Sequence, residues 1–282
     1  EYETHNTRKN VGLFDLTPFS KFEIKSEKAH QELQKICTAN IKKDAGKCTY
    51  THMLNTDGGI EADLTVVSVD ENHFRIISSA ATRERDKHHI KKHLNKDIEL
   101  EDVTDDYCVF GLFGPKSRDL MNSLSNDNFS NENFRFSTAK FISIEDTKIW
   151  TQRLSYVGEL GYELYVEVKD AKKIYELIIN KGKDFNLSNC GMHAMDIMRM
   201  ESGFLHWGHD ISPEENQYQA GLSFTISNKK NVDFIGKRAL EKIDKKKIKT
   251  RFAMFTLKDS KPGEPLLLCL LYTSPSPRDL RK

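Results

Sequence analysis

The chain has 282 residues, of which 38% are hydrophobic and 30% are charged, and its formal net charge is +1. This balance excludes a general attraction for nucleic acid, a membrane surface or a polyanionic partner, while the length allows a sizeable core divided between two or more lobes. The five cysteines include no C-x-x-C pair, which argues against a zinc knuckle or a redox pair and favours buried thiols in a reducing compartment such as the cytoplasm.

The first hundred residues alternate between strand and helix patterns. The turn signal Asn55-Thr-Asp-Gly-Gly59 separates two strand-like runs and predicts a hairpin. The expected elements, in chain order, are a strand at 19–24, a helix at 30–36, the hairpin of 50–54 with 63–69, a strand at 74–78 and a charged helix at 82–94.

The second half continues the mixture without a regular strand–helix–strand rhythm. Gly114-Pro115 opens a helix, because proline is well accommodated in a first helical turn. Further strands are expected at 141–144, 148–154 and 162–168, and further helices at 171–180 and 191–201. We therefore predict an α+β fold with mixed antiparallel sheets and flanking helices.

Asp63 is the residue that we expect to carry chemistry. It lies inside Glu61-Ala-Asp-Leu-Thr-Val-Val-Ser68, where a carboxylate in an otherwise apolar strand loses solvation unless a ligand or partner satisfies it. Such an acid is suited to proton transfer. A strand-end aspartate that caps a turn amide is the alternative. Leu64, Thr65 and Val66 would line a pocket through backbone groups and methyls, or pack in a core.

The densest polar cluster of the sequence is Ser155-Tyr-Val-Gly-Glu-Leu-Gly-Tyr-Glu-Leu-Tyr165. Its glycines let the backbone turn sharply or approach a flat ring. Glu159 and Glu163 offer acceptors to an N–H-rich heterocycle, and Tyr156 and Tyr165 offer stacking faces. These residues predict a pterin or purine site. An ordinary hairpin with aromatic cross-strand pairs is the alternative.

Period-two alternation divides the strand within this cluster into two faces. We expect one face to be core and the other to be partly wet. The first face would carry Tyr162, Leu164 and Val166, and the second Glu163, Tyr165 and Glu167.

Arg199 lies on the predicted helix 191–201, with Gly203 as a suitable C-terminal stop. Its guanidinium would either form a structural ion pair with Asp196 or Glu201, or present its planar fork to a ligand carboxylate. We interpret the methionine stripe at 192, 195 and 198 as core.

Two other patterns are discounted. His89 and His93 have metal-ligand spacing, but they lie on a helix crowded with lysine and arginine, so we expect a solvated charged face and no metal site. The segment 111–117 lacks the spacing and ending of a phosphate-binding loop.

The cluster at 155–165 resembles the Tyr-x-Gly-Glu-x-Gly-Tyr/Trp-Glu signature of the folate-binding aminomethyltransferase family. That family includes the glycine-cleavage T-protein and the C-terminal halves of dimethylglycine and sarcosine dehydrogenases. The resemblance covers about residues 1–260, and the dehydrogenase branch is the more similar one. It also rests on the segments 12–22, 52–66, 110–117, 195–210 and 220–237.

The resemblance implies roles for individual residues. Asp63 would lie at the reactive edge of tetrahydrofolate and manage a proton there. Glu159 or Glu163 would bind the pterin N–H groups, Tyr156, Leu164 and Tyr165 would lie beside the ligand, and Arg199 would belong to the site wall. Phe224 matches an aromatic position that flanks the folate.

The implied function is capture of an iminium or formaldehyde carbon as 5,10-methylenetetrahydrofolate by a domain of a dimethylglycine/sarcosine dehydrogenase-like enzyme. Tetrahydrofolate would be the cofactor, with FAD held by a flavin domain that precedes this chain in the parent protein. The location would be cytoplasmic, or the mitochondrial matrix in a eukaryote. The alternatives are a stand-alone glycine-cleavage-type aminomethyltransferase and a folate-binding module without catalysis.

The resemblance also predicts the domain organisation. Residues 1–245 would form the folate-binding domain as two intertwined lobes, and 246–265 would begin a truncated C-terminal β-barrel with a first strand at 251–257. Residue 1 is glutamate rather than methionine, and we expect a cut there. Residues 266–282 leave the family pattern, and we interpret them as a non-native tail.

Overall fold

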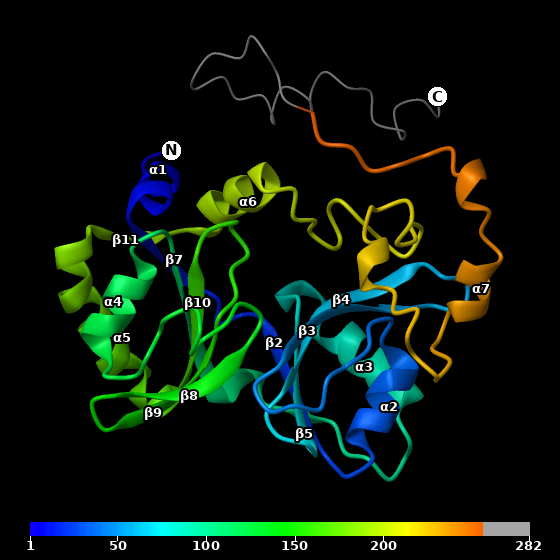
Figure 1. Ribbon diagram of the computed structural model, residues 1–282, viewed down its shortest axis with the longest axis horizontal. Coiled ribbons are helices and arrows are strands. Elements are labelled where there is room, and N and C mark those ends of the chain that lie inside the picture. Colours follow the sequence, from blue (N-terminus) through cyan, green and yellow to red (C-terminus); the bar gives the residue numbers. More distant parts are fainter. Residues whose placement is uncertain (256–282) are drawn as a thin grey trace. The chain divides into compact units, whose positions relative to one another are not determined.

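The computed structural model describes residues 1–255, and Glu1–Arg251 form one compact unit, to which the description of the fold refers (Figure 1). The helices are α1 (Tyr2–Lys9), α2 (Ala29–Ile36), α3 (Arg83–His93), α4 (Ser117–Leu124), α5 (Val168–Gly182), α6 (Met192–Glu201) and α7 (Lys237–Glu241). The strands are β1 (Val11–Asp15), β2 (Ser20–Lys25), β3 (Cys48–Leu54), β4 (Ile60–Ser68), β5 (His73–Ser78), β6 (Glu101–Asp102), β7 (Tyr107–Phe113), β8 (Ala139–Ile144), β9 (Thr147–Gln152), β10 (Gly161–Glu167) and β11 (Leu187–Cys190).

Two sheets organise the unit. One has six strands in the order β11-β1-β7-β10-β9-β8, and the other has five in the order β3-β4-β5-β2-β6. Neighbouring strands run antiparallel except β1 and β11, which pair in parallel from Val11 opposite Leu187. We call these the six-stranded and the five-stranded sheet.

Most of the expected elements are present with shifted ends, and the α+β class is confirmed. The hairpin of β3 and β4 is longer than predicted on both sides of its turn. Residue 168 was expected in a strand but begins α5, and the start of the helix expected at 82 is a 3-10 turn. The parallel pair β1–β11 was not predicted, because no local turn signal connects strands about 175 residues apart.

Each sheet packs one face against its own helices. The five-stranded sheet sends alternate apolar side chains, such as Leu64 and Val66 of β4, against Leu33 of α2 and Ile90 of α3. The six-stranded sheet does the same against α4 and α5, with Leu164 in contact with that second core. Apolar stripes are present on α2, α4 and α5, and helices this short are stable only when such a stripe is packed.

A third core lies between the two sheets. It joins Val67 and Cys48 of the five-stranded sheet to Trp150 and Tyr165 of the six-stranded sheet. Met198 of α6 also packs there. The opposite faces of both sheets therefore enclose a common space, which we call the inter-sheet space.

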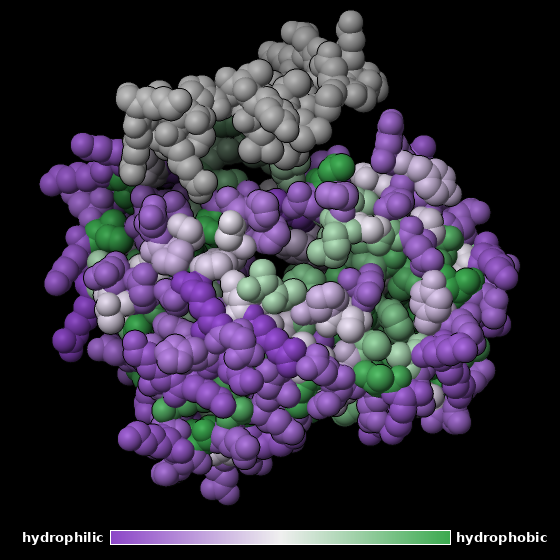
Figure 2. Space-filling model, turned by 180° about the vertical axis from the view of Figure 1, so that it is seen from behind, coloured by the Kyte–Doolittle hydropathy of each residue, from purple (hydrophilic) through white to green (hydrophobic). Residues whose placement is uncertain are grey.

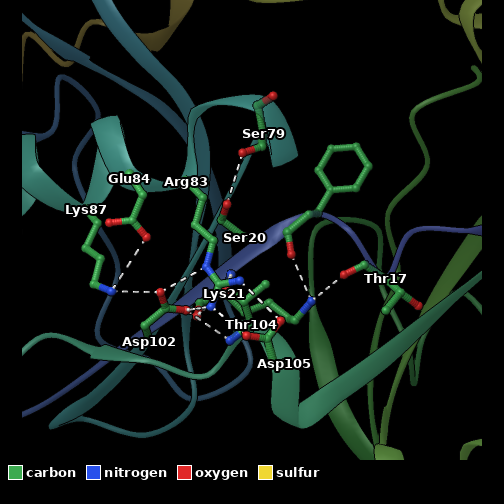
Figure 3. Close-up of polar contacts among 11 residues, drawn as sticks. Thr17, Ser20, Lys21, Ser79, Arg83, Glu84, Lys87, Asp102, Thr104 and Asp105 are labelled. Atoms are coloured by element: carbon green, nitrogen blue, oxygen red, sulfur yellow. Dashed lines mark hydrogen bonds and ion pairs between the residues drawn. The ribbon is translucent and has the colours of Figure 1, made fainter.

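A polar cluster fixes the far end of the five-stranded sheet (Figure 3). Arg83 of α3 and Lys87 both contact the carboxylate of Asp102 on β6, at 3.0 Å. The ammonium group of Lys21 donates to the carbonyl oxygens of Thr17 at 2.9 Å and of Phe19 at 2.8 Å. Burial lowers the pKa of Lys21 to about 8, an effect that the charge of Asp105 opposes. The ion pairs tie α3 to β6, and the Lys21 bonds fix the loop that leads into β2.

The surface agrees with the high content of charged residues, 30% of the sequence. Figure 2 shows hydrophilic residues over most of the face opposite to the view of Figure 1, with hydrophobic residues gathered in smaller groups. Within residues 1–255, no helix has both the length and the apolar character needed to cross a membrane. The first barrel strand expected at 251–257 is not formed over 251–255. The rest of that strand and the tail at 266–282 lie outside the described residues.

Candidate functional site

The register of β3 and β4 brings a row of polar side chains to the inter-sheet space. Tyr50 lies opposite Thr65, and His52 lies opposite Asp63. Residues opposite one another in an antiparallel pair point to the same face. Because Cys48 and Val67, at the end of this row, belong to the core between the sheets, the whole row faces that space.

Asp63 is a partly open acid at the end of this row. Its side chain is 16% exposed, and its Oδ1 lies 3.9 Å from Nε2 of His52. Burial raises the pKa of Asp63 to about 7, the nearby Tyr50 hydroxyl opposes this shift, and the charge of Asp86 adds to it. The carboxyl group can therefore exchange a proton close to neutral pH.

Tyr50 and His52 enclose Asp63 from β3. The Tyr50 hydroxyl lies 3.3 Å from His52 Nε2. The His52 side chain is fully buried, and this burial lowers its pKa to about 3. Burial and the neighbouring Asp63 charge hold the pKa of Tyr50 well above its usual value. Both residues are thus neutral around pH 7.

A second acid, Glu163 of β10, faces the inter-sheet space from the six-stranded sheet. Its carboxylate accepts a hydrogen bond of 3.1 Å from Tyr165, and burial raises the pKa of Glu163 to about 7 while that bond lowers it. Gln152 of β9 lies opposite Glu163 in the ladder and is fully buried. Neither Gln152 amide atom has a hydrogen-bond partner among the described residues. Unpaired buried amide groups are costly, so these atoms suit a ligand with both donors and acceptors.

Asp63 and Glu163 lie beside different residues of β3. Glu163 influences the pKa of Cys48, whereas Asp63 is opposite His52. His52 lies four positions after Cys48 along β3, which corresponds to about 13 Å. This separation fits an elongated ligand with N–H groups at one end and a reacting amine farther along.

Aromatic rings cover the Asp63 end of the row. Phe224 is 74% exposed and stacks on Tyr50, with ring centroids 6.3 Å apart. Tyr156 stacks on Phe204 at 6.2 Å and donates its hydroxyl to the carbonyl oxygen of Leu205 at 2.7 Å. The pKa of Tyr156 is raised above its usual range by burial, and the Arg199 charge opposes this shift. A flat ligand could be held between such rings.

Arg199 has the structural ion pairs that were one of its two sequence interpretations. Its Nε donates to Asp196 at 2.8 Å, and its Nη1 donates to the carbonyl oxygen of Phe204 at 3.1 Å and to Asp210. Asp210 in turn accepts from the backbone N–H of His206 at 2.9 Å. The guanidinium group is only about 6% exposed and anchors the segment that carries Phe204.

Glu159 lies in a different arrangement from Glu163. Its carboxylate pairs with Arg8 of α1 at 2.9 Å, and Arg8 also binds Glu201 at 2.8 Å and the carbonyl oxygen of Val157 at 2.7 Å. Glu201, expected as a partner of Arg199, is therefore a partner of Arg8. This network ties α1 to α6 and gives Glu159 a structural role that sequence spacing did not indicate.

Three of the predicted ligand contacts have side chains that point away from the inter-sheet space. Leu64 and Val66 pack under α2 and α3, and Leu164 packs against α5. Strand alternation explains this, because their neighbours Thr65 and Tyr165 occupy the other face. A ligand in the inter-sheet space could meet these three residues only through their backbone. On the face of β10 expected to be partly wet, Tyr165 is only 3% exposed, but Glu163 is half-buried and Glu167 is exposed, so that face is partly wet as expected.

Two interpretations of the sequence, the solvated histidine pair and the core methionine stripe, need partial correction. His89 is buried rather than solvated, and its ring lies 4.6 Å from that of His93. Of the methionine stripe on α6, Met195 and Met198 are core, but Met192 is 56% exposed because it begins the helix. Within residues 1–255, no cluster of three or more histidine, cysteine or acidic residues is arranged to hold a metal ion.

Sequence reasoning missed Tyr50, His52, Gln152 and Phe204. A signal for the first two was present, since the hairpin around 55–59 fixes which residues of β3 lie opposite Asp63. Gln152 and Phe204 gave no such signal. Their positions depend on the pairing of β9 with β10 and on the ion pairs of Arg199.

Comparison with known proteins gives one family. The model of the GCVT N-terminal domain matches residues 1–230. The chain is 37% identical to 4-methylaminobutanoate oxidase (formaldehyde-forming) of Paenarthrobacter nicotinovorans, over 90% of this chain and 31% of that protein. It is 34% identical to mitochondrial dimethylglycine dehydrogenase of Rattus norvegicus, over 90% of this chain and 30% of that protein. The chain thus spans about a third of these two relatives.

An aminomethyltransferase of Halothermothrix orenii is 31% identical, over 91% of this chain and 71% of that protein. Among solved structures, glycine cleavage system aminomethyltransferase T from Bartonella henselae has a TM-score of 0.76 at 22% identity, over 85% of this chain and 65% of that one. At this identity, the likeness concerns the fold alone.

Proposed function

Because this chain belongs to the GCVT N-terminal domain family, we propose that it is a tetrahydrofolate-binding domain for one-carbon transfer. Its product would be 5,10-methylenetetrahydrofolate, formed from an iminium or formaldehyde carbon. The observation that carries the proposal is the pair of half-buried acids with raised pKa values, Asp63 and Glu163, on opposite walls of the inter-sheet space. The family resemblance of both motifs supports the same ligand.

The residues present fit such a ligand. Glu163 and the unpaired amide of Gln152 offer acceptors and a donor to the N–H-rich pterin ring. Tyr50, Phe224 and Tyr156 would bound the flat part of the molecule nearer Asp63. Tetrahydrofolate itself supplies the nucleophilic amine nitrogens.

Asp63 would act as the base for such an amine. Its pKa of about 7 matches proton transfer at neutral pH, which is the condition for efficient acid–base catalysis. Holding the amine beside the electrophile would supply the proximity part of the rate enhancement. Arg199 would act indirectly, by fixing the segment with Phe204.

We further propose that the parent protein oxidises a methylamine of the dimethylglycine or sarcosine type with FAD outside this chain. This proposal is supported by the sequence identity of 37% to the 4-methylaminobutanoate oxidase and of 34% to the dimethylglycine dehydrogenase. The rival is a stand-alone aminomethyltransferase, favoured by the coverage of 71% of one such protein. Flavin absorbance in the purified parent protein would support the first proposal, and full-length parent protein without flavin would support the second.

The test of folate binding is calorimetric titration of tetrahydrofolate into the full chain at pH 7.5, with circular dichroism to establish folding. We expect saturable binding by the parent chain. Glu163→Gln should weaken the affinity at least tenfold, and Asp63→Asn should change the number of protons taken up on binding. Glu159→Gln is the matched control, because that carboxylate is engaged by Arg8, and it should bind as the parent does. Folded parent protein without saturable binding would refute the proposal.

A further inference from the structure

The neutral ring of His52 lies next to Asp63 and has a hydrogen on only one of its nitrogens. Which nitrogen carries it is decided by the hydrogen bonds that the other groups around the ring can make. The consequence is chemical, because Nε2 points at the Tyr50 hydroxyl and toward Asp63. The location of one hydrogen on His52 therefore affects the acid itself.

The surroundings of Nδ1 assign the hydrogen to that nitrogen. Nδ1 lies 3.0 Å from Oγ1 of Thr225, whose own hydrogen goes to the carbonyl oxygen of Leu222 at 2.7 Å. That Oγ1 can therefore only accept from His52. Gln217 Nε2 is 3.1 Å from Nδ1 but has nearer acceptors for its two hydrogens, Thr225 at 2.6 Å and Thr38 at 3.0 Å.

Nε2 consequently offers a lone pair. The Tyr50 hydroxyl, 3.3 Å away, has a single hydrogen and two neighbouring acceptors, His52 Nε2 and the Asp63 carboxylate. The His52 side chain is fully buried, so an unmatched Nε2 would carry the cost of an unsatisfied buried acceptor. Asp63 is 16% exposed and can be satisfied by water or by a ligand. This difference favours donation from Tyr50 to His52.

We propose that His52 is a positioning residue whose Nε2 holds the Tyr50 hydroxyl hydrogen, so that the Asp63 carboxylate keeps its acceptor sites free for an N–H group of a ligand. Thr225 and Gln217 hold the ring in the required tautomer from the segment that also carries Phe224. The proposal rests on the proposed function only in naming that ligand as a folate amine.

The first experiment reads the tautomer directly in the full chain. Nitrogen-15 NMR of the histidine rings, with His52 assigned by its loss in His52→Gln, should show a protonated Nδ1 and a bare Nε2 at pH 7.5. A protonated Nε2 would overturn the proposal, because Nε2 would then donate and the Tyr50 hydrogen would be free to bond to Asp63.

The second experiment follows the pKa of Asp63 by carbon-13 NMR. The groups that face this carboxyl are Tyr50 and His52 of β3, Asp86 of α3 and Tyr156 of the connection before β10. In His52→Leu, Tyr50 is released to donate to Asp63, and the acid ionisation constant should rise about tenfold. Adding Tyr50→Phe to that variant should return it toward the parent value.

The single variant Tyr50→Phe completes the double-mutant cycle of His52 and Tyr50. It should leave the Asp63 pKa near the parent value, whereas a clear rise would overturn the proposal, since Tyr50 would then have been donating to Asp63. Tyr175→Phe on α5 is the matched control for loss of a tyrosine hydroxyl. Should His52→Leu not fold, the tautomer of the parent and the Tyr50→Phe result still decide the matter.

Titration with tetrahydrofolate separates this proposal from the proposed function. Folded His52→Leu should bind tetrahydrofolate about tenfold more weakly than the parent, because its Asp63 is already engaged. If the parent binds no folate, the proposed function fails while the tautomer and the pKa cycle still test His52. If the parent binds and the NMR results are reversed, only the role of His52 fails.

Discussion

The two faces of β4 share one backbone but have opposite surroundings. Ala62, Leu64 and Val66 are buried in the apolar core under α2 and α3. Asp63 and Thr65 face the inter-sheet space, where acids and amide groups lie without full sets of partners. The comparison teaches that one strand can stabilise the fold with one set of side chains and keep the other set available for chemistry. Four changes would test it.

The largest effect is expected where the inter-sheet face of the five-stranded sheet holds a buried ion pair. Glu23 of β2 binds Arg75 of β5 at 2.6 Å, and both side chains are 5% exposed. Glu23→Gln would leave Arg75 buried without its charge partner, and we expect a loss of about 3–5 kcal/mol in unfolding free energy, measured by urea titration. Glu101→Gln, which removes an exposed partner of Lys25, is the control. A loss below about 1 kcal/mol would contradict the comparison.

The next effect belongs to the sealed face. Leu64→Ala removes a fully enclosed side chain and should cost about 3 kcal/mol, from lost burial and the cavity left behind. Thr65→Ala, one residue along but on the open face, should change the stability by less than about 0.5 kcal/mol. Equal losses at both positions would show that the inter-sheet face is packed as tightly as the helix-covered one.

Asp63→Asn should stabilise the protein, in contrast to the two losses. Since the folded pKa of Asp63 is about 7 and the ordinary value is 3.8, the folded state holds more protons between these limits, and ionised Asp63 destabilises it as pH rises. We expect a gain of about 1–2 kcal/mol at pH 8 and a smaller gain at pH 5, by thermal unfolding. A variant that loses stability at pH 8 would contradict the assigned burial.

The smallest effect is expected at Glu159. Its ion pair with Arg8 is partly open to water, with side chains 22% and 27% exposed, and such pairs contribute little. Glu159→Gln should lower the unfolding free energy by at most about 1 kcal/mol. Glu163→Gln should instead leave stability unchanged or raised, because burial raises the pKa of Glu163 as it does that of Asp63. If Glu159→Gln raised the stability and Glu163→Gln lowered it, Glu159 would again be a candidate site residue.

Local patterns were sufficient for most of the five-stranded sheet and its helices and for β8 to β10, but they did not predict α1, α7 or the strands β1, β6, β7 and β11. The turn at 55–59 placed the β3–β4 hairpin, and alternation correctly divided β10 into a face with Tyr162 and a face with Glu163. Apolar periodicity placed α2, α5 and α6 within a few residues. These features depend on neighbours within one or two turns of chain, which a single sequence contains.

By itself, the sequence determined the α+β class and the carboxylate in a strand, and its motifs indicated the family. Only the tertiary structure decided that Glu159 pairs with Arg8 while Glu163 faces the inter-sheet space. It alone also decided the ion pairs of Arg199 and the neighbours of His52. The physical reason is that burial, pKa and hydrogen-bond partners come from contacts that form only on folding. Some of them, such as Arg8 with Glu159 and His52 with Thr225, join residues more than a hundred positions apart.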